Sequence, residues 1–151
     1  MRFLDYERAI KKIREILSTE GKSKVLEDVV IFLFQNFGKY SWVGIYFVEG
    51  NDLVLGPWNG PHATEHTRIP IGKGICGAAA SLGKTEIVDD VKKDKRYIAC
   101  FLSTRSEIVV PIIKNDKIVG EIDIDSEKIA AFTRNDELFL KKIAILISKF
   151  F

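Results

Sequence analysis

The stretch EIDIDS, residues 121–126, alternates acidic and aliphatic side chains, and this period of two predicts a β-strand. We expect its isoleucines, Ile122 and Ile124, to point into an apolar layer. The three acids, Glu121, Asp123 and Asp125, then project together from the opposite face. Such a row of carboxylates fits either the solvated outer face of an antiparallel sheet or the lining of a pocket, and the rest of the chain has to distinguish the two.

Helical periods flank the strand-like part of the chain. Region 1–38 predicts two helices with apolar stripes, and Ser23 is the expected N-cap of the second. Residues 133–150 predict a closing amphipathic helix. Thr133, followed three residues later by Asp136, resembles a capping box in which Asp replaces the usual Glu or Gln.

The middle of the chain, residues 40–126, has the period of strands. Two hairpins are expected, one turning at residues 50–52 and one at residues 115–116. Between them the segment GKGICGAAASLG, residues 72–83, predicts a glycine-rich loop that runs into a short helix. We therefore expect a single α+β domain over residues 1–151, with a central antiparallel sheet flanked by N-terminal and C-terminal helices.

Charge and composition exclude several classes of protein. The 23 Lys and Arg nearly balance the 21 Asp and Glu, so there is no basic excess of the kind that nucleic-acid binding needs. No apolar stretch approaches the roughly 20 residues that cross a bilayer, and the charged N-terminus is unlike a secretory signal. A cytoplasmic protein is expected, with neither a nucleic-acid nor a membrane partner.

Two rings and a glycine share one face of the first predicted strand, WVGIYF. Trp42, Gly44 and Tyr46 alternate with aliphatic and aromatic residues that belong to the opposite face. The rings fit equally well under a helix, as ordinary core, or in an aromatic box for a small apolar or sulfur-bearing group. The glycine would leave a gap between them.

The segment His62–His66 fits the pattern H-x-x-E-H of a class of zinc peptidases. That chemistry needs both histidines on one face of a helix, and this segment has no apolar helical period of its own. A structural zinc held by His62 or His66 with Cys76 and Cys100 has suitable ligand types, but its spacing is unlike that of a zinc finger or ribbon. No metal site is therefore predicted.

The two cysteines have different surroundings in the sequence. Cys76 is expected near the start of a helix, where the helix dipole lowers a thiol pKa if that end is open to solvent; a small buried side chain is the alternative. Cys100 lies in a polar loop rich in Lys and Arg, where cations favour the thiolate. Cys100 is thus the stronger candidate for a nucleophile or redox centre.

Several spaced motifs resemble one family. The order WVGIYF, LGPWNG, RIPIGKGICG, IVDDV, IAC, SEIVVP and DIDS, over about residues 40–136, is similar to that of the free methionine-(R)-sulfoxide reductases, which are built on a GAF domain. The 24-residue separation of Cys76 and Cys100 agrees with the family pattern. The resemblance implies a single GAF domain and the reduction of free L-methionine-(R)-sulfoxide, with no metal or organic cofactor.

The resemblance also implies roles for individual residues. The nucleophile that attacks the sulfoxide falls on Cys100 in IAC, and the substrate pocket falls on Trp42, Tyr46, Glu107, Asp123 and Asp125. Clustered carboxylates suit the substrate ammonium, and a carboxyl that keeps its proton suits the sulfoxide oxygen. Attack leaves a sulfenic acid, which a second thiol converts into a disulfide that a thioredoxin-like or small-thiol reductant reopens. Glu121 has no family role and is expected to be solvated.

One departure from the family affects the redox cycle. The family typically carries a further cysteine ten residues before the GICG cysteine, and here that position is His66. Resolution then falls to Cys76 or to an external thiol, and a non-catalytic GAF module that senses a small amino-acid-like molecule is the alternative function. The amphipathic terminal helices suit a homodimer as well as an intramolecular core.

Overall fold

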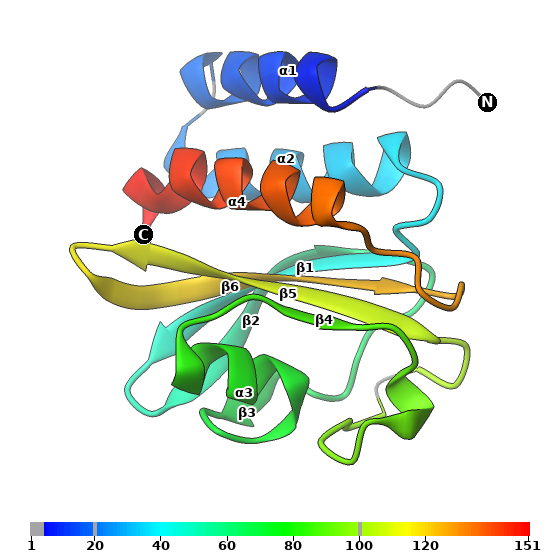
Figure 1. Cartoon of the computed structure of the whole chain (residues 1–151). Coiled ribbons are helices and arrows are strands. Elements are labelled where there is room, and N and C mark those ends of the chain that lie inside the picture. Colours follow the sequence, from blue (N-terminus) through cyan, green and yellow to red (C-terminus); the bar gives the residue numbers. More distant parts are fainter. Residues whose placement is uncertain (1–4, 20, 100) are drawn as a thin grey trace.

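The computed structural model describes residues 5–19, 21–99 and 101–151, and it has helices on both faces of one six-stranded antiparallel sheet (Figure 1). The strand order is β3-β2-β1-β6-β5-β4, and every neighbouring pair is antiparallel. The strands are β1 Trp42–Glu49, β2 Asp52–Asn59, β3 Arg68–Pro70, β4 Glu86–Val88, β5 Ser106–Lys114 and β6 Lys117–Ser126. The α+β class and the central antiparallel sheet are confirmed.

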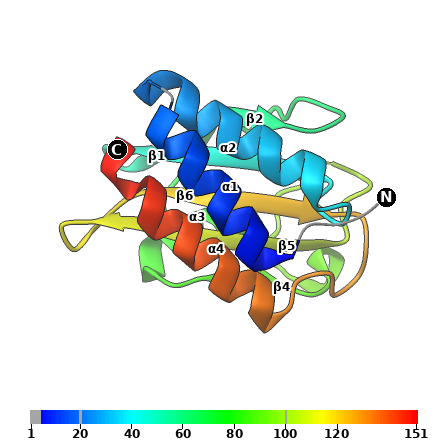
Figure 2. The same ribbon diagram turned by 90° about the horizontal axis from the view of Figure 1, so that it is seen from above.

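Four α-helices form layers around the sheet. They are α1 Tyr6–Thr19, α2 Lys22–Asn36, α3 Gly74–Leu82 and α4 Arg134–Ile147, with short 3-10 turns at Val91–Lys93 and Ser148–Phe150. Helices α2 and α4 lie on one face of the sheet, and α1 lies over them as an outer layer (Figures 1 and 2). Helix α3 lies on the opposite face (Figure 1). None of the helices in the described part of the chain combines the length and the apolar character needed to span a membrane.

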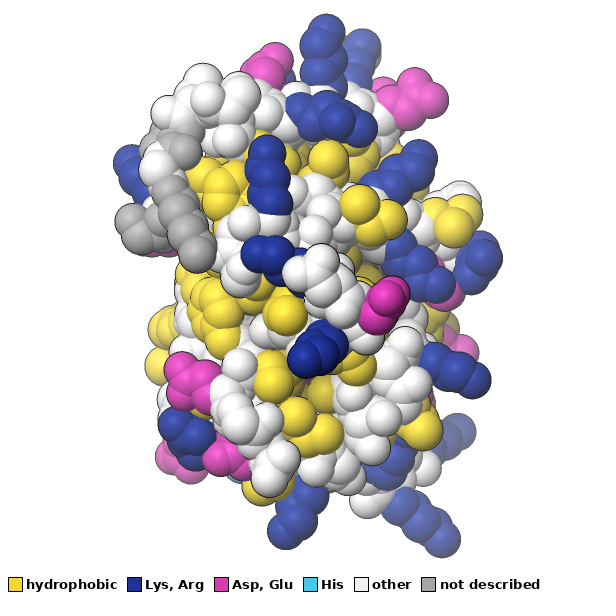
Figure 3. Space-filling view, turned by 90° about the vertical axis from the view of Figure 1, so that its left-hand side faces the viewer, with side chains coloured by type: hydrophobic (Ala, Val, Ile, Leu, Met, Phe, Trp, Pro, Cys, Tyr) yellow, Lys and Arg dark blue, Asp and Glu magenta, His cyan; other side chains and the backbone are white. Residues whose placement is uncertain are grey.

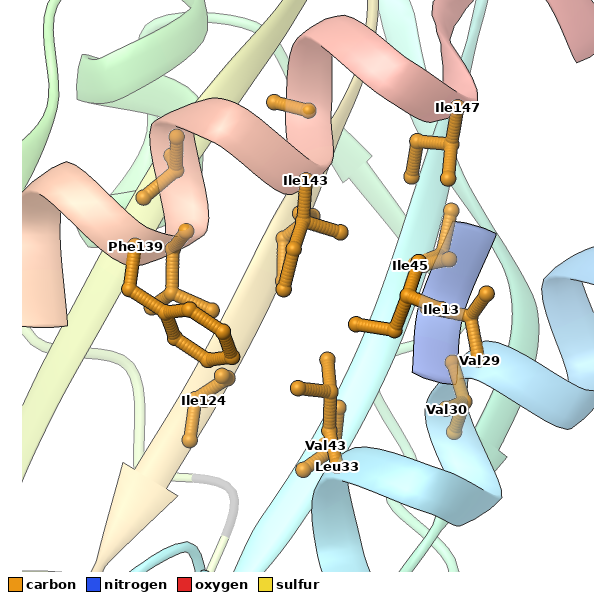
Figure 4. Close-up of a cluster of buried hydrophobic side chains, with 14 of the residues drawn as sticks. Ile13, Val29, Val30, Leu33, Val43, Ile45, Ile124, Phe139, Ile143 and Ile147 are labelled. Atoms are coloured by element: carbon orange, nitrogen blue, oxygen red, sulfur yellow. The ribbon is translucent and has the colours of Figure 1, made fainter. Parts of the chain in front are cut away.

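The main core fills the space between the sheet and helices α1, α2 and α4. Figure 4 shows Val43, Ile45 and Ile124 of the strands directed toward Ile143 of α4 and Leu33 of α2. Ile122 and Ile124 are both buried here, as the alternation in EIDIDS predicts. The apolar half of each central strand therefore faces the helices, which leaves the other half for the α3 side.

The helix ends test two predictions from the sequence. The capping box of α4 is confirmed, because Thr133 Oγ1 accepts a hydrogen bond from the Asp136 amide and the Thr133 amide donates to Asp136 Oδ2 at 2.8 Å. The prediction of Ser23 as the N-cap of α2 is wrong. Gly21 is the N-cap, since its carbonyl accepts hydrogen bonds from the amides of Lys24 and Val25, and Ser23 lies inside the helix.

Asp136 also links α4 to the chain just before β1. Tyr40 donates a hydrogen bond to Asp136 Oδ1 at 2.7 Å, and Lys39 forms an ion pair with Oδ2. Burial acts to raise the pKa of Asp136, but the hydrogen bonds from Lys39, the Thr133 amide and Tyr40 outweigh it and hold the pKa below its usual value. An ionised carboxylate at this helix N-terminus is stabilised by the helix dipole as well.

Basic side chains form no single patch on the face shown in Figure 3. Lys and Arg are scattered there among acidic and apolar side chains. This distribution matches the balanced composition, with 23 basic and 21 acidic residues in the chain. The described residues on this face therefore do not gather into the concentrated positive surface that binds a phosphate backbone.

Candidate active site

The acids of EIDIDS lie on the α3 face of the sheet and are buried. The exposed fraction is 0% for Glu121 and 3% for both Asp123 and Asp125. Helix α3 and the loops around it cover this face, so the interpretation as a solvated outer face is wrong, and so is the expectation that Glu121 is solvated. Asp123 and Asp125 each line a small cavity on this face.

Strand register brings a fourth acid and a tryptophan to the same place. Glu107 of β5 lies opposite Asp125 of β6, and Asp125 lies opposite Trp42 of β1 on its other side. Glu107 is also buried. Tyr46 lies four residues after Trp42 on β1 and therefore on the same face of the sheet. Its hydroxyl donates a hydrogen bond to the carbonyl of His66 at 3.0 Å. The five residues that the resemblance assigned to the pocket thus lie on the face of the sheet that α3 and the neighbouring loops cover.

The expected gap at Gly44 is filled by Trp42 itself. An ideal Cβ on Gly44 would lie 2.3 Å from the indole Cη2 of Trp42, so the ring occupies the place that a side chain would take. The indole stacks on Trp58, with ring centroids 6.2 Å apart, and contacts the ring of Phe101 at 5.8 Å. These three rings form an aromatic wall beside the acids. The Trp42 Nε1 atom is buried and has no hydrogen-bond partner among the described residues.

Cys76 lies in the first turn of α3, over the acids. The glycine-rich sequence allows the close approach of this helix: Gly74 has φ of +68°, and a Cβ on Gly77 would lie 2.8 Å from the Pro70 carbonyl oxygen. The Cys76 side chain is buried, and its thiol donates to Glu107 Oε2 at 3.9 Å.

Cys76 follows the second of the two expectations, a small buried side chain, and the condition for a pKa lowered by the helix dipole, an end open to solvent, is not met. Burial raises the pKa of the thiol well above its usual value. The charges of Asp123, Glu121 and Glu107 act in the same direction. The helix end is not open to solvent, so Cys76 rests as a neutral thiol.

Crowding and burial also affect the carboxyl groups. Burial raises the pKa of Glu121 well above its usual value, and the charge of Asp123 adds to the shift. Burial likewise raises the pKa of Asp123 and of Asp125. No described Lys, Arg or His forms an ion pair with these three acids. At least one carboxyl in the cluster therefore keeps its proton near neutral pH.

The space around the cluster is small. One cavity of about 20 Å³ is lined by Tyr46, Cys76, Glu107, Asp123 and the loop residues Tyr97 and Ile98. A second, of about 10 Å³, is lined by Trp42, His62, Phe101, Thr104 and Asp125, among others. Each has room for about one water molecule. A hollow of about 490 Å³ lies elsewhere, between β5 and α4, and none of these acids lines it.

Cys100, the expected nucleophile, lies outside the described residues. Its neighbours in sequence contact the site: the Ala99 carbonyl oxygen lies 3.2 Å from His66 Nε2, and Phe101 packs on Trp42.

His66 and His62 lie in a segment without helical structure, so the geometry that H-x-x-E-H needs for zinc catalysis is absent from it.

Glu121 is the residue that the sequence reasoning missed. Both of its carboxyl oxygens are buried without a hydrogen-bond partner in the described part of the chain. It lies between Tyr46 of β1 and Pro111 of β5 in the ladder, and its charge influences Cys76. The sequence pattern could have indicated this, because Glu121, Asp123 and Asp125 occupy every second position of the strand and so share one face.

Comparisons with known proteins agree with this architecture. The GAF domain family profile matches residues 9–149. The free methionine-R-sulfoxide reductase of Escherichia coli is 35% identical over 124 residues, which cover 82% of this chain and 74% of that protein. The Saccharomyces cerevisiae enzyme of the same name is 49% identical over 113 residues, 72% of this chain and 62% of that protein. The structure of the Neisseria meningitidis free methionine-R-sulfoxide reductase in complex with its substrate superposes with a TM-score of 0.92 at 36% identity, covering 100% of this chain and 94% of that one.

Proposed function

The chain belongs to the GAF domain family and, within it, to the free methionine-R-sulfoxide reductases, and from this premise we propose that it reduces free L-methionine-(R)-sulfoxide to methionine. The observation that carries the proposal is the buried cluster of Glu107, Asp123 and Asp125 beside the rings of Trp42 and Tyr46. A solvated acidic face or a purely apolar core would have excluded it.

The cluster matches the chemical groups of the substrate. The buried carboxyl groups of Asp123 and Asp125 are suited to the substrate ammonium, which they would hold by charge-assisted hydrogen bonds. The indole of Trp42 and the ring of Tyr46 offer a surface for the S-methyl group, because sulfur groups contact aromatic rings favourably. A carboxyl that keeps its proton can donate it to the sulfoxide oxygen.

In the proposed reaction the Cys100 thiolate attacks the sulfoxide sulfur. Oxygen passes from the substrate sulfur to Cys100, methionine leaves, and Cys100 becomes a sulfenic acid. A second thiol then forms a disulfide with Cys100 and releases the oxygen as water. A thioredoxin-like protein or a small thiol supplies the two electrons that restore the thiol, a cycle suited to the reducing cytoplasm.

The identity of the thiol that forms the disulfide with Cys100 needs its own proposal, because His66 stands where the family typically has a cysteine. Cys76 is the one other cysteine in the chain. Its raised pKa makes it a slow nucleophile while it remains buried between α3 and the sheet. We therefore propose that Cys76 resolves Cys100 only after the first turn of α3 moves away from the sheet, in competition with direct attack by an external thiol.

Substrate binding requires a similar movement. Cavities of about 20 and 10 Å³ cannot hold an amino acid, so the walls around them must separate. The connection from β4 to β5 supplies Tyr97, Ile98, Phe101 and Thr104 to the two cavities. This connection is the proposed moving wall, since the strands on the other side are fixed in the sheet.

The deciding experiment measures methionine formed from free methionine-(R)-sulfoxide, first in one turnover without reductant and then in steady state. We expect about one methionine per chain from the wild type and from Cys76→Ser, and none from Cys100→Ser. In steady state, Cys76→Ser should lose more activity with a thioredoxin system than with dithiothreitol. Absence of turnover in the wild type, together with retained binding of the sulfoxide, would instead support the sensor function.

A further inference from the structure

Three buried side chains from three different elements converge over the sheet. Cys76 of α3, Glu107 of β5 and Asp123 of β6 each offer one potential ligand atom, and these atoms all lie within 4.8 Å of one another. We propose that they form a binding site for a single zinc-like divalent cation.

The spacing of the atoms is close to that of zinc coordination. Zinc lies about 2.3 Å from a thiolate sulfur and about 2.1 Å from a carboxylate oxygen, so tetrahedral geometry places sulfur and oxygen about 3.6 Å apart. The separation of Cys76 Sγ from Glu107 Oε2 is 3.9 Å. Small side-chain rotations would close the difference. Three protein ligands leave a fourth position open, as in many zinc sites that exchange their fourth ligand.

An independent observation points to a ligand at this place. Asp123 is 3% exposed, lines the same small cavity as Cys76 and Glu107, and its Oδ1 atom has no hydrogen-bond partner among the described residues. Buried polar atoms are normally hydrogen-bonded, so the unpartnered Asp123 Oδ1 is an exception that a bound cation would explain.

The donor set decides which cation fits. A thiolate is a soft ligand that favours Zn²⁺ and Co²⁺, whereas Mg²⁺ and Ca²⁺ take oxygen ligands alone. Binding forms a bond from the metal to the Cys76 sulfur and releases the thiol proton to the buffer. Because the same residues line the proposed substrate pocket, the cation and the substrate ammonium exclude each other. This competition rests on the proposed function, but metal binding itself does not.

The test is a titration of the reduced, metal-free protein with Co²⁺, followed by its near-ultraviolet thiolate-to-metal absorption band and by calorimetry. We expect one Co²⁺ per chain, a band that Zn²⁺ displaces and Mg²⁺ does not, and loss of the band in Cys76→Ser. Asp123→Asn should weaken binding at least about tenfold. Glu27→Gln, an exposed acid on α2 at the opposite face of the sheet, is the matched control and should bind like the wild type.

Several results would overturn the proposal. They are the absence of a band in the wild type, a band that persists in Cys76→Ser, and a band that disappears in Cys100→Ser. If Cys76→Ser does not fold, Asp123→Asn decides, and unchanged affinity in that variant rejects the site. A protein without reductase activity would still give this titration, so failure of the proposed function is recognised separately.

Discussion

Asp123 of β6 lies directly opposite Gly44 of β1, and the indole of Trp42 covers the space where Gly44 has no side chain. The acid in the middle of the site therefore has a flat aromatic surface beside it, while a larger residue at position 44 would force the indole away. In the proposed function, recognition of the substrate ammonium and of its S-methyl group would thus be coupled through one glycine.

Gly44→Ala should disturb both stability and substrate binding. The new methyl group would meet the indole at 2.3 Å, an overlap that costs about 1–3 kcal/mol in the free energy of unfolding. Urea denaturation measures this cost, and the KM for methionine sulfoxide should rise in parallel. In a Trp42→Leu background, Gly44→Ala should cost much less than in the wild type, because the ring that the methyl group meets is gone. A fully stable Gly44→Ala would contradict the placement of the ring.

Asp125→Asn should weaken recognition of the substrate ammonium. We expect kcat/KM for methionine sulfoxide to fall at least about tenfold, which corresponds to about 1.4 kcal/mol. The sharper comparison uses a sulfoxide substrate of the same length without the amino group. Wild type and variant should process that analogue at similar rates, whereas an equal loss with both substrates would mean that Asp125 acts elsewhere in the reaction.

Glu121→Gln should stabilise the protein at alkaline pH. The folded-state pKa of Glu121 is raised, so its contribution to stability is fully present below its unfolded pKa and is lost as pH rises through the folded value. The melting temperature of the variant should match that of the wild type near pH 4 and exceed it at pH 8 by at least about 2–4 °C, the effect of 1 kcal/mol in a domain of this size. Glu27→Gln, on the exposed side of α2, is the control and should show no such divergence.

Asp136→Asn should have the opposite dependence on pH. The folded-state pKa of Asp136 is lowered, so its contribution is present above its unfolded pKa and is lost as pH falls through the folded value. At pH 7 we expect a loss of about 3 kcal/mol, because Lys39 and Tyr40 lose a buried charged partner. The difference in unfolding free energy from the wild type should shrink below pH 3. The neighbouring Glu137→Gln, which removes only surface ion pairs, should cost less than about 1 kcal/mol.

Local patterns in the sequence were enough to predict most of the fold. The period of two in EIDIDS assigned Ile122 and Ile124 to the core, and Thr133 with Asp136 marked the start of α4. These features depend on contacts within a few residues, which is why they can be read directly. The N-cap of α2 was misplaced, because Gly21 and Ser23 are both acceptable at a helix start and side-chain type alone does not choose between them.

The sequence by itself determined which residue types are present on each face of each strand and, through the order of its motifs, the family. Only the tertiary structure decided that the acidic face is buried, because burial depends on α3 returning to cover strands far from it in sequence. The same cover raises the pKa of Cys76 and of Glu121, although nothing next to either residue in the sequence predicts that. An ionisable group responds to the solvent and charges around it in space, and those are fixed only when the whole chain has folded.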